Sequence, residues 1–228
     1  MISSLLKKYQ DQFGDIFDFK IDAENSVSLD FSKENSLITI DIIENSVAQE
    51  QFVFGQIKNA SARVGVGGYL ENRKLYQRGN IFDTEADSRS LHLGIDLWIE
   101  AGTTVNTPFD GVVFSVKDNS GTGDYGPTVI LEHQLEHHIF YTLYGHLSLD
   151  TLTNVKVGDR FMTGHKLCKI GNYPDNGDWA PHVHFQILTN LDDFKYGDYP
   201  AVCTQANLAK FSGYCPNPNL VLQIPILD

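Results

Sequence analysis

Ala180-Pro181-His182-Val183-His184-Phe185 places two histidines one residue apart inside an apolar run. Because side chains alternate between the two faces of a strand, His182 and His184 point to one side and Val183 points to the other. The two Cα atoms would lie about 6 to 7 Å apart, two strand rises. The pair suits one metal ligand beside a second histidine that handles an attacking water. It also suits two polar residues on the solvent face of a half-buried strand.

A second stretch, Leu91-His92-Leu93-Gly94-Ile95-Asp96-Leu97-Trp98, shows the same alternation. His92, Gly94 and Asp96 share one face, and the apolar side chains share the other, which we expect to face the core. On a straight strand the Cα atoms of His92 and Asp96 would lie roughly 13 Å apart, which is long for two ligands of one metal ion. We therefore expect the chain to bend, and a bulge or kink forms most easily at Gly94.

A third stretch, Tyr-Thr-Leu-Tyr-Gly-His-Leu-Ser over residues 141–148, brings His146 to the polar end of a strand-like run. Each motif is weak alone, but together they place four histidines and one aspartate opposite apolar faces. Two histidines and a carboxylate with an open fourth position are typical of catalytic zinc sites, since structural zinc sites are closed by four protein ligands. The remaining two histidines would be free for proton transfer.

The rest of the chain after residue 90 consists of short apolar runs separated by Gly- and Pro-containing turns, which predicts a mainly β, antiparallel domain. The expected strands are 91–98, 104–106, 111–116, 127–133, 139–146, 160–168 and 182–188. The Pro- and Asn-rich stretch 199–228 is expected to wrap around this domain, with 220–226 as a candidate final strand.

Residues 1–62 are predicted to form a small α+β unit that carries no chemistry and packs on, or partly covers, the domain 63–228. Periodic apolar residues predict a helix over 3–13, ended by Gly14, and a second helix over 47–57, capped by Asn45 or Ser46. The expected strands of this unit are 16–21, 26–31 and 37–42, and a strand or edge segment at 69–76 is expected at the start of the domain 63–228. The glycines at 65–68 mark the boundary, and no Lys-Ser or Lys-Thr pair follows them as in a phosphate loop.

The composition excludes several classes of partner. The 228 residues include 17 Lys and Arg against 29 Asp and Glu, a net charge of −12, and no basic run, which argues against nucleic acid and membrane surfaces. Neither a signal peptide nor an apolar stretch long enough to span a membrane is visible, so we expect a cytoplasmic protein unless another export route operates. In the cytoplasm Cys168, Cys203 and Cys215 would be reduced thiols, although Cys203 and Cys215 could form a disulfide.

Four histidines do not belong to these motifs. His133, His137 and His138 lie between two strand-like runs, and their HxxxH spacing lacks the HExxH order of a zinc helix. We interpret this stretch as a solvated hairpin turn. His165 follows Gly164 and is predicted to be exposed in another turn.

The three motifs together resemble the lysostaphin/LytM-type zinc metallopeptidases over roughly residues 65–190. That family has H-x-x-x-D, a histidine within Y-(G/A)-H-L-S, and H-x-H. Here the motifs read His92-Leu-Gly-Ile-Asp96, Tyr144-Gly-His146-Leu-Ser148 and His182-Val-His184. The family commonly ends the last motif as G-P-H-L-H-F-E, and this chain departs from it without losing a key residue.

The resemblance implies the duplicated hybrid-motif fold of an antiparallel β-sheet or sandwich, with the activity of a zinc endopeptidase that holds one Zn²⁺ per chain. By resemblance His92, Asp96 and His184 are the zinc ligands. The resemblance also implies that His146 and His182 are the catalytic pair that orients and polarises the attacking water and stabilises the tetrahedral intermediate.

The resemblance also implies a peptide or muropeptide substrate, with peptidoglycan and Gly-containing peptides as candidates. Two other functions stay open: a non-catalytic binding or scaffold module that keeps the fold, and a zinc hydrolase of a small cytosolic amide. The first 62 residues could also act as an inhibitory pro-region. The sequence does not indicate the oligomeric state.

Overall fold

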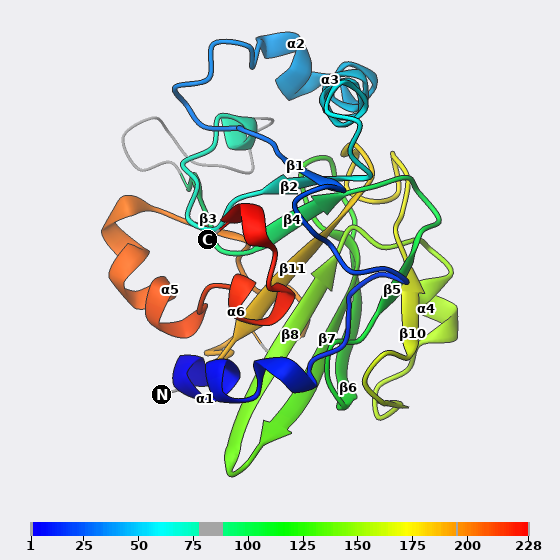
Figure 1. Cartoon of the computed structure of the whole chain (residues 1–228), viewed down its shortest axis with the longest axis vertical. Coiled ribbons are helices and arrows are strands. Elements are labelled where there is room, and N and C mark those ends of the chain that lie inside the picture. The colour runs from blue at the N-terminus through cyan, green and yellow to red at the C-terminus, as the bar shows by residue number, and fades with distance from the viewer. Residues whose placement is uncertain (1, 78–88, 195, 228) are drawn as a thin grey trace.

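An eight-stranded sheet dominates the computed structural model, which describes residues 2–77, 89–194 and 196–227 (Figure 1). Its strands are β1 (Ser26–Ser28), β2 (Val64–Gly67), β4 (Ile95–Trp98), β6 (Gly111–Asn119), β7 (Gly126–Leu135), β8 (His138–Gly145), β9 (Arg160–Phe161) and β11 (His182–Leu188). They lie in the order β1-β2-β4-β11-β8-β7-β6-β9, and every neighbouring pair is antiparallel except β1 and β2. The mainly β, antiparallel fold that the sequence predicted is therefore confirmed.

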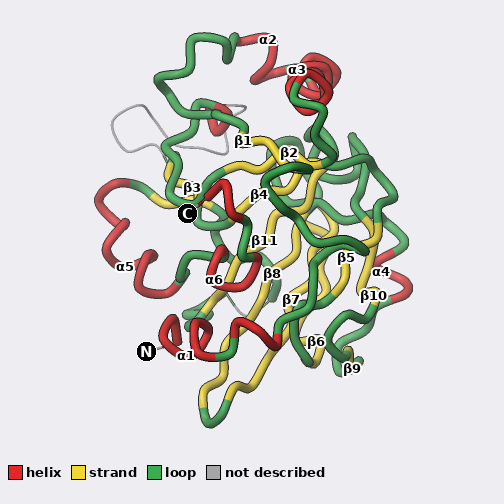
Figure 2. Tube along the Cα trace, viewed as in Figure 1, coloured by secondary structure: helices red, strands yellow, loops and turns green. Residues whose placement is uncertain are grey.

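Two small sheets accompany the large one (Figure 2). Their strands are β3 (Leu91–His92) with β12 (Val202–Cys203) and β5 (Thr104–Asn106) with β10 (Lys166–Lys169). The predicted strand 91–98 is thus split into β3 and β4 at Leu93-Gly94, where a bend was expected. The predicted strand 160–168 is wrong in its middle, because a turn at Gly164, with a φ of 78°, separates β9 from β10.

The main core lies against one face of the large sheet. Val183, Phe185 and Ile187 of β11 have no exposed surface and belong to this core. Leu6 and Phe17, from the first residues of the chain, are buried in the same cluster. Figure 1 shows α1 (Ile2–Lys8) beside α6 (Asn219–Leu222), so both ends of the chain pack near the sheet.

The first part of the chain matches the prediction only in part. The helix predicted over 47–57 is confirmed as α3 (Ser46–Asn59), and Asn45 caps it by accepting hydrogen bonds from the first backbone N–H groups. The helix predicted over 3–13 is divided into α1 and the 3₁₀ turn η1 (Gln10–Gln12). β1 confirms part of 26–31 and pairs with β2. The unit boundary at residue 62 stays a prediction.

Two other predicted strands in this part are wrong. Residues 16–19 form bends, residues 20–21 are irregular, and both Ile16 and Ile21 are buried in the main core. The stretch 37–42 instead starts the helix α2 (Ile40–Glu44), because the hydroxyl of Thr39 accepts a hydrogen bond from Ile42 N and caps it. The predicted segment 69–76 holds isolated bridges and the start of η2 (Leu75–Gln77).

The last part of the chain is more helical than expected. It contains β12, the 3₁₀ turn η4 (Gln205–Asn207), α5 (Leu208–Tyr214), α6 and the 3₁₀ turn η5 (Pro225–Leu227). The predicted strand 220–226 is wrong, because both side-chain ends of Asn219 hydrogen-bond the backbone of Ile224 and close a turn. Cys203 and Cys215 are buried, and all three cysteines are free thiols. Among the described residues, no helix has the length and apolarity needed to cross a membrane.

Candidate active site

The register of β4 against β11 pairs Asp96 with His184, so their side chains leave the sheet side by side. The break at Gly94 turns β3 away to pair with β12, and this bend brings His92 Nε2 to 3.3 Å from Asp96 Oδ1. A Cβ atom on Gly94 would lie 2.5 Å from His184 Cε1. Gly94 therefore provides the bend and also the space that the His184 ring occupies.

The three side chains are buried and their ligand atoms converge. His184 Nδ1 lies 3.0 Å from His92 Nε2 and 2.9 Å from Asp96 Oδ1. The other nitrogen of each ring already has an acceptor: His92 Nδ1 lies 3.0 Å from Gly68 O, and His184 Nε2 lies 2.8 Å from Gln186 Oε1. When each of these nitrogens donates its proton, the two facing nitrogens carry lone pairs.

Two imidazole lone pairs and a carboxylate oxygen thus face one another, an arrangement that a cation stabilises. A tetrahedral metal ion with ligand bonds of about 2.1 Å would separate its ligand atoms by roughly 3.4 Å, close to the distances of 2.9 to 3.3 Å found here. Burial lowers the pKa of His92 to about 4, so this ring is neutral near pH 7. Two histidines and a carboxylate are also the donor set of catalytic zinc sites. The residues present fit zinc.

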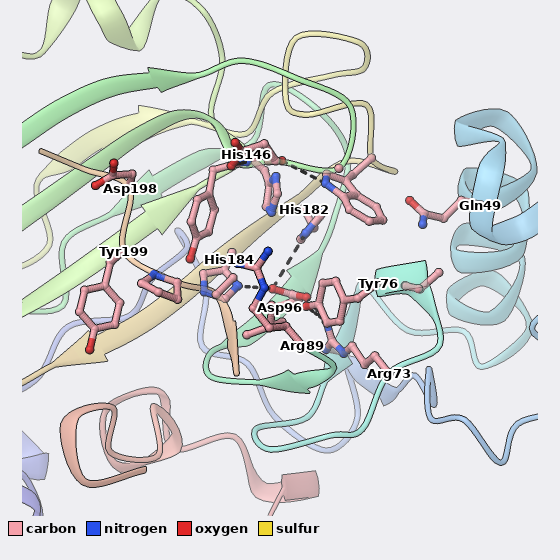
Figure 3. A pocket seen from close by; sticks show the side chains of 18 of the residues that line it. Gln49, Arg73, Tyr76, Arg89, Asp96, His146, His182, His184, Asp198 and Tyr199 are labelled. Atoms are coloured by element: carbon pink, nitrogen blue, oxygen red, sulfur yellow. Dashed lines mark hydrogen bonds and ion pairs between the residues drawn. The ribbon is translucent and has the colours of Figure 1, made fainter. Parts of the chain in front are cut away.

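His146 and His182 form a second pair beside this cluster, with ring centroids 4.2 Å apart (Figure 3). His146 Nδ1 lies 2.8 Å from Asn176 O, and His182 Nδ1 lies 2.7 Å from Ala180 O. Because the Nδ1–H groups donate to these carbonyls, the Nε2 atoms carry the lone pairs. Burial, reinforced by His182, lowers the pKa of His146 well below its usual value, and burial also lowers the pKa of His182. Both rings are therefore neutral bases near pH 7.

A loop held by α3 provides both carbonyls. The Ala180 N–H donates to Gln49 Oε1 at 2.7 Å, and the Ser46 hydroxyl lies 2.5 Å from Asp178 Oδ1. Tyr173 donates to Glu50 Oε2 at 2.8 Å. The first turn of α3 therefore holds the loop that orients His146 and His182.

These groups border a cavity of about 270 Å³. Asp96, His146, His182 and His184 line it. Figure 3 shows Gln49 of α3 on one side of this cavity and Asp198 and Tyr199 on the opposite side. Its walls thus come from the sheet, from the first part of the chain and from the last.

Sequence reasoning missed Arg73, whose guanidinium Nη1 donates to Asp96 Oδ2. Burial alone would raise the pKa of Asp96, but His92 and Arg73 outweigh it and hold the pKa well below its usual range. The only sequence signal was the pair Glu71 and Arg73, two residues apart on one face of an extended segment. Gln49 was also missed, because its contact with Ala180 joins segments far apart in the chain.

The histidines outside the motifs lie away from the site. The predicted hairpin is confirmed, but β7 continues to Leu135 and the exposed fraction of His133 is only 2%. His133 is not solvated because its Nδ1–H donates to Asp110 O and its Nε2 accepts from the Thr142 hydroxyl. His165 is exposed in a turn, as predicted.

Residues 90–195 match the model of Peptidase family M23. Among solved structures, the chain is similar to a zinc-containing peptidase from Vibrio cholerae, with 26% identity over 43% of this chain and 27% of that one and a TM-score of 0.33. The catalytic domain of the antimicrobial peptidase lysostaphin from Staphylococcus simulans shares 22% identity over 54% of this chain and 80% of that one, with a TM-score of 0.34.

A mutant catalytic domain of the prophage-encoded M23 protein EnpA from Enterococcus faecalis shares 22% identity over 49% of this chain and 84% of that one, with a TM-score of 0.37. The chain therefore spans about a quarter of the Vibrio cholerae peptidase but most of the two catalytic domains. No curated protein matches the chain.

Proposed function

Residues 90–195 carry a domain of peptidase family M23, and from this premise we propose that the chain is a zinc-dependent endopeptidase. The observation that carries the proposal is the convergence of three lone-pair atoms, from His92, Asp96 and His184, beside two neutral histidines. We propose His92, Asp96 and His184 as the ligands of one zinc ion per chain. His146 and His182 are the groups that move protons.

Zinc bound there would supply Lewis-acid chemistry, lowering the pKa of a water molecule and polarising the scissile carbonyl. Either His146 or His182 accepts the one proton that the attacking water gives up, and does so at Nε2, because the Nδ1 atoms of both rings donate to backbone carbonyls. The protonated ring then returns the proton to the leaving amine. His182 Nε2 lies 4.0 Å from Asp96 Oδ1, so this base stands directly beside the proposed ligands.

As the substrate we propose a peptide of the cell-wall class, a muropeptide or a Gly-containing peptide. The support is the family domain and a cavity beside the proposed ligands that Gln49 lines on one side and Tyr199 on the other (Figure 3). A peptide main chain offers carbonyl groups to donors such as the Gln49 amide. The Oε1 atom of Gln49 accepts a hydrogen bond from Ala180 N–H, and the Nε2 atom of Gln49 has no hydrogen-bond partner among the described residues.

A second candidate is a zinc hydrolase of a small amide. One observation favours it: the cavity is only about 270 Å³ and has walls from α3 on one side and residues 198–202 on the other. Binding sites for drug-sized molecules usually measure about 300 to 1,000 Å³. The two candidates differ in substrate length, because walls on both sides favour a short substrate over an internal bond of a long chain.

Mass-spectrometric profiling of hydrolysis tests the proposal. Zinc-loaded protein is offered muropeptides, Gly-rich peptides and small amides, each with and without a chelator. The expected result is cleavage that disappears with the chelator and in His146→Ala, but not in His165→Ala, which changes an exposed histidine. Intact substrates throughout, with zinc verified on the protein, would contradict the proposal and support a non-catalytic binding module.

A further inference from the structure

Arg73 precedes the M23 domain in the chain, yet its side chain reaches the proposed zinc site. This side chain is 2% exposed, and its guanidinium donates from Nη1 to Asp96 Oδ2. We propose that Arg73 is a positioning residue that reserves Oδ2 of Asp96 and thereby presents only Oδ1 to the metal ion. This inference rests on the proposed function, because it concerns how the same zinc site is built.

The two oxygens of Asp96 have different surroundings. Oδ1 lies 2.9 Å from His184 Nδ1 and 3.3 Å from His92 Nε2, which are the atoms proposed to bind the metal. Oδ2 accepts from Arg73. A carboxylate can bind a metal ion through one oxygen or both, and a permanently charged donor on Oδ2 keeps that oxygen away from the metal.

Arg73 is fixed on its other sides as well. Its Nε donates to Glu71 Oε2 at 2.7 Å, and Glu71 Oε1 in turn accepts from Phe31 N at 2.8 Å. The guanidinium carbon lies 5.7 Å from the ring centroids of both Phe31 and Trp98. A Cβ atom on Gly67 would lie 2.5 Å from Arg73 Nη2, so one glycine of the 65–68 cluster makes room for this side chain.

The charges also agree with this role. Arg73 lies between two carboxylates, Glu71 and Asp96. Glu71 balances the arginine, so the negative charge of Asp96 remains available to a metal cation. A buried arginine beside a metal ligand would otherwise oppose metal binding. The pair Glu71 and Arg73 therefore orients Asp96 without neutralising it.

The test compares the full chain with Arg73→Lys, which keeps the charge but loses the planar fork, and with Arg73→Met, which loses both. Arg63→Met is the matched control, because Arg63 is half exposed and pairs with the exposed Asp18. Zinc affinity is measured by competition with a chelator, and the visible absorption spectrum of the Co²⁺ form reports coordination. Circular dichroism of each metal-free variant checks folding.

The expected result is zinc binding that is weaker by about 10- to 100-fold in both Arg73 variants, the usual effect of losing an outer-shell partner. We also expect a changed Co²⁺ spectrum, because the released Oδ2 can join the metal, and no change in Arg63→Met. An unchanged Co²⁺ spectrum in the folded variants would overturn the inference, since a merely structural role would leave coordination as it is.

A crystal structure of the zinc-loaded parent decides the same question if the variants do not fold. The expected structure keeps Oδ2 on Arg73 and only Oδ1 on the metal. A carboxylate bound through both oxygens, or a broken contact with Arg73, would overturn the inference alone. A parent that takes up no zinc would overturn the proposed function and the inference together.

Discussion

The central strands of the sheet and the segments that flank them contribute to the site in different ways. β4 and β11 of the large sheet and the end of β8, together with the short strand β3 that precedes β4, supply the five residues proposed to bind zinc and move protons. The flanking segments are residues 2–77 and 196–227. From them, Arg73 hydrogen-bonds the proposed ligand Asp96, Gln49 holds the loop that contains Ala180, and Tyr199 lines the cavity. The comparison suggests that the strands determine the chemistry and that the flanks determine orientation and substrate size.

The largest effect is expected from His146→Ala, on the strand side of this comparison. Removing a general base usually lowers the rate by about 10² to 10⁴, and we expect kcat to fall in this range with zinc still bound. The measurement is steady-state kinetics on the substrate found by profiling, together with metal analysis. His165→Ala, an exposed histidine, is the control. Activity within about threefold of the parent would remove His146 from the proposed pair.

A smaller effect is expected from Gln49→Ala, on the flanking side. The mutation leaves the buried Ala180 N–H without its acceptor, a cost of about 1 to 3 kcal/mol, and loosens the loop whose carbonyls orient His146 and His182. We expect kcat to fall by about tenfold while zinc affinity is unchanged. Gln51→Ala is the matched control, because Gln51 is an exposed glutamine of the same helix. Equal kinetics of the two variants would show that α3 does not serve the site.

The same comparison explains what could be predicted from the sequence. The long strands β7, β8 and β11 alternate regularly or are bounded by clear turn residues, so their positions were predicted within a few residues. The stretches 37–42 and 220–226 are short apolar runs, whose periodicity does not distinguish a strand from a helix. There, local hydrogen bonds made by Thr39 and Asn219 decide the structure.

The site divides along the same line. The five histidine and aspartate residues lie in motifs whose spacing places them on one face, so the sequence predicted that they would lie together. Their roles as ligands and bases stay a proposal. Arg73 and Gln49 lie in stretches without such a pattern, and each reaches the site only because distant segments pack together. Local sequence patterns do not predict contacts between segments that are far apart in the sequence.

A further prediction contrasts the site with a buried histidine of the hairpin. Burial lowers the pKa of His133 from 6.5 to about 4. Its contribution to stability is therefore fully present above about pH 6.5 and is lost as the pH falls toward 4, because only the unfolded chain binds the proton in that interval. We expect His133→Gln to reduce the slope of unfolding free energy against pH by up to about 1.4 kcal/mol per pH unit.

Urea denaturation of the metal-free protein between pH 4 and 7 measures this slope. His137→Gln is the control, because His137 is an exposed residue of the same hairpin. If the two variants have the same slope as the parent, the buried neutral state of His133 is wrong.

The smallest effect is expected from Tyr173→Phe. This substitution removes the hydrogen bond to Glu50, which lies near the surface, and leaves the buried contact between Gln49 and Ala180 in place. Surface contacts of charged groups contribute little, so we expect kcat and KM within about twofold of the parent. A loss as large as that of Gln49→Ala would mean that the whole first turn of α3 acts as one unit.

The central claim is that His92, Asp96 and His184 form a metal site beside a separate pair of bases, and a calorimetric titration with Zn²⁺ tests it most directly. The titration compares metal-free parent, Asp96→Ala and His146→Ala. The account predicts one zinc per chain in the parent and in His146→Ala, and no binding at this site in Asp96→Ala. A parent that binds no zinc, or an Asp96→Ala variant that binds it as tightly as the parent, would contradict the account.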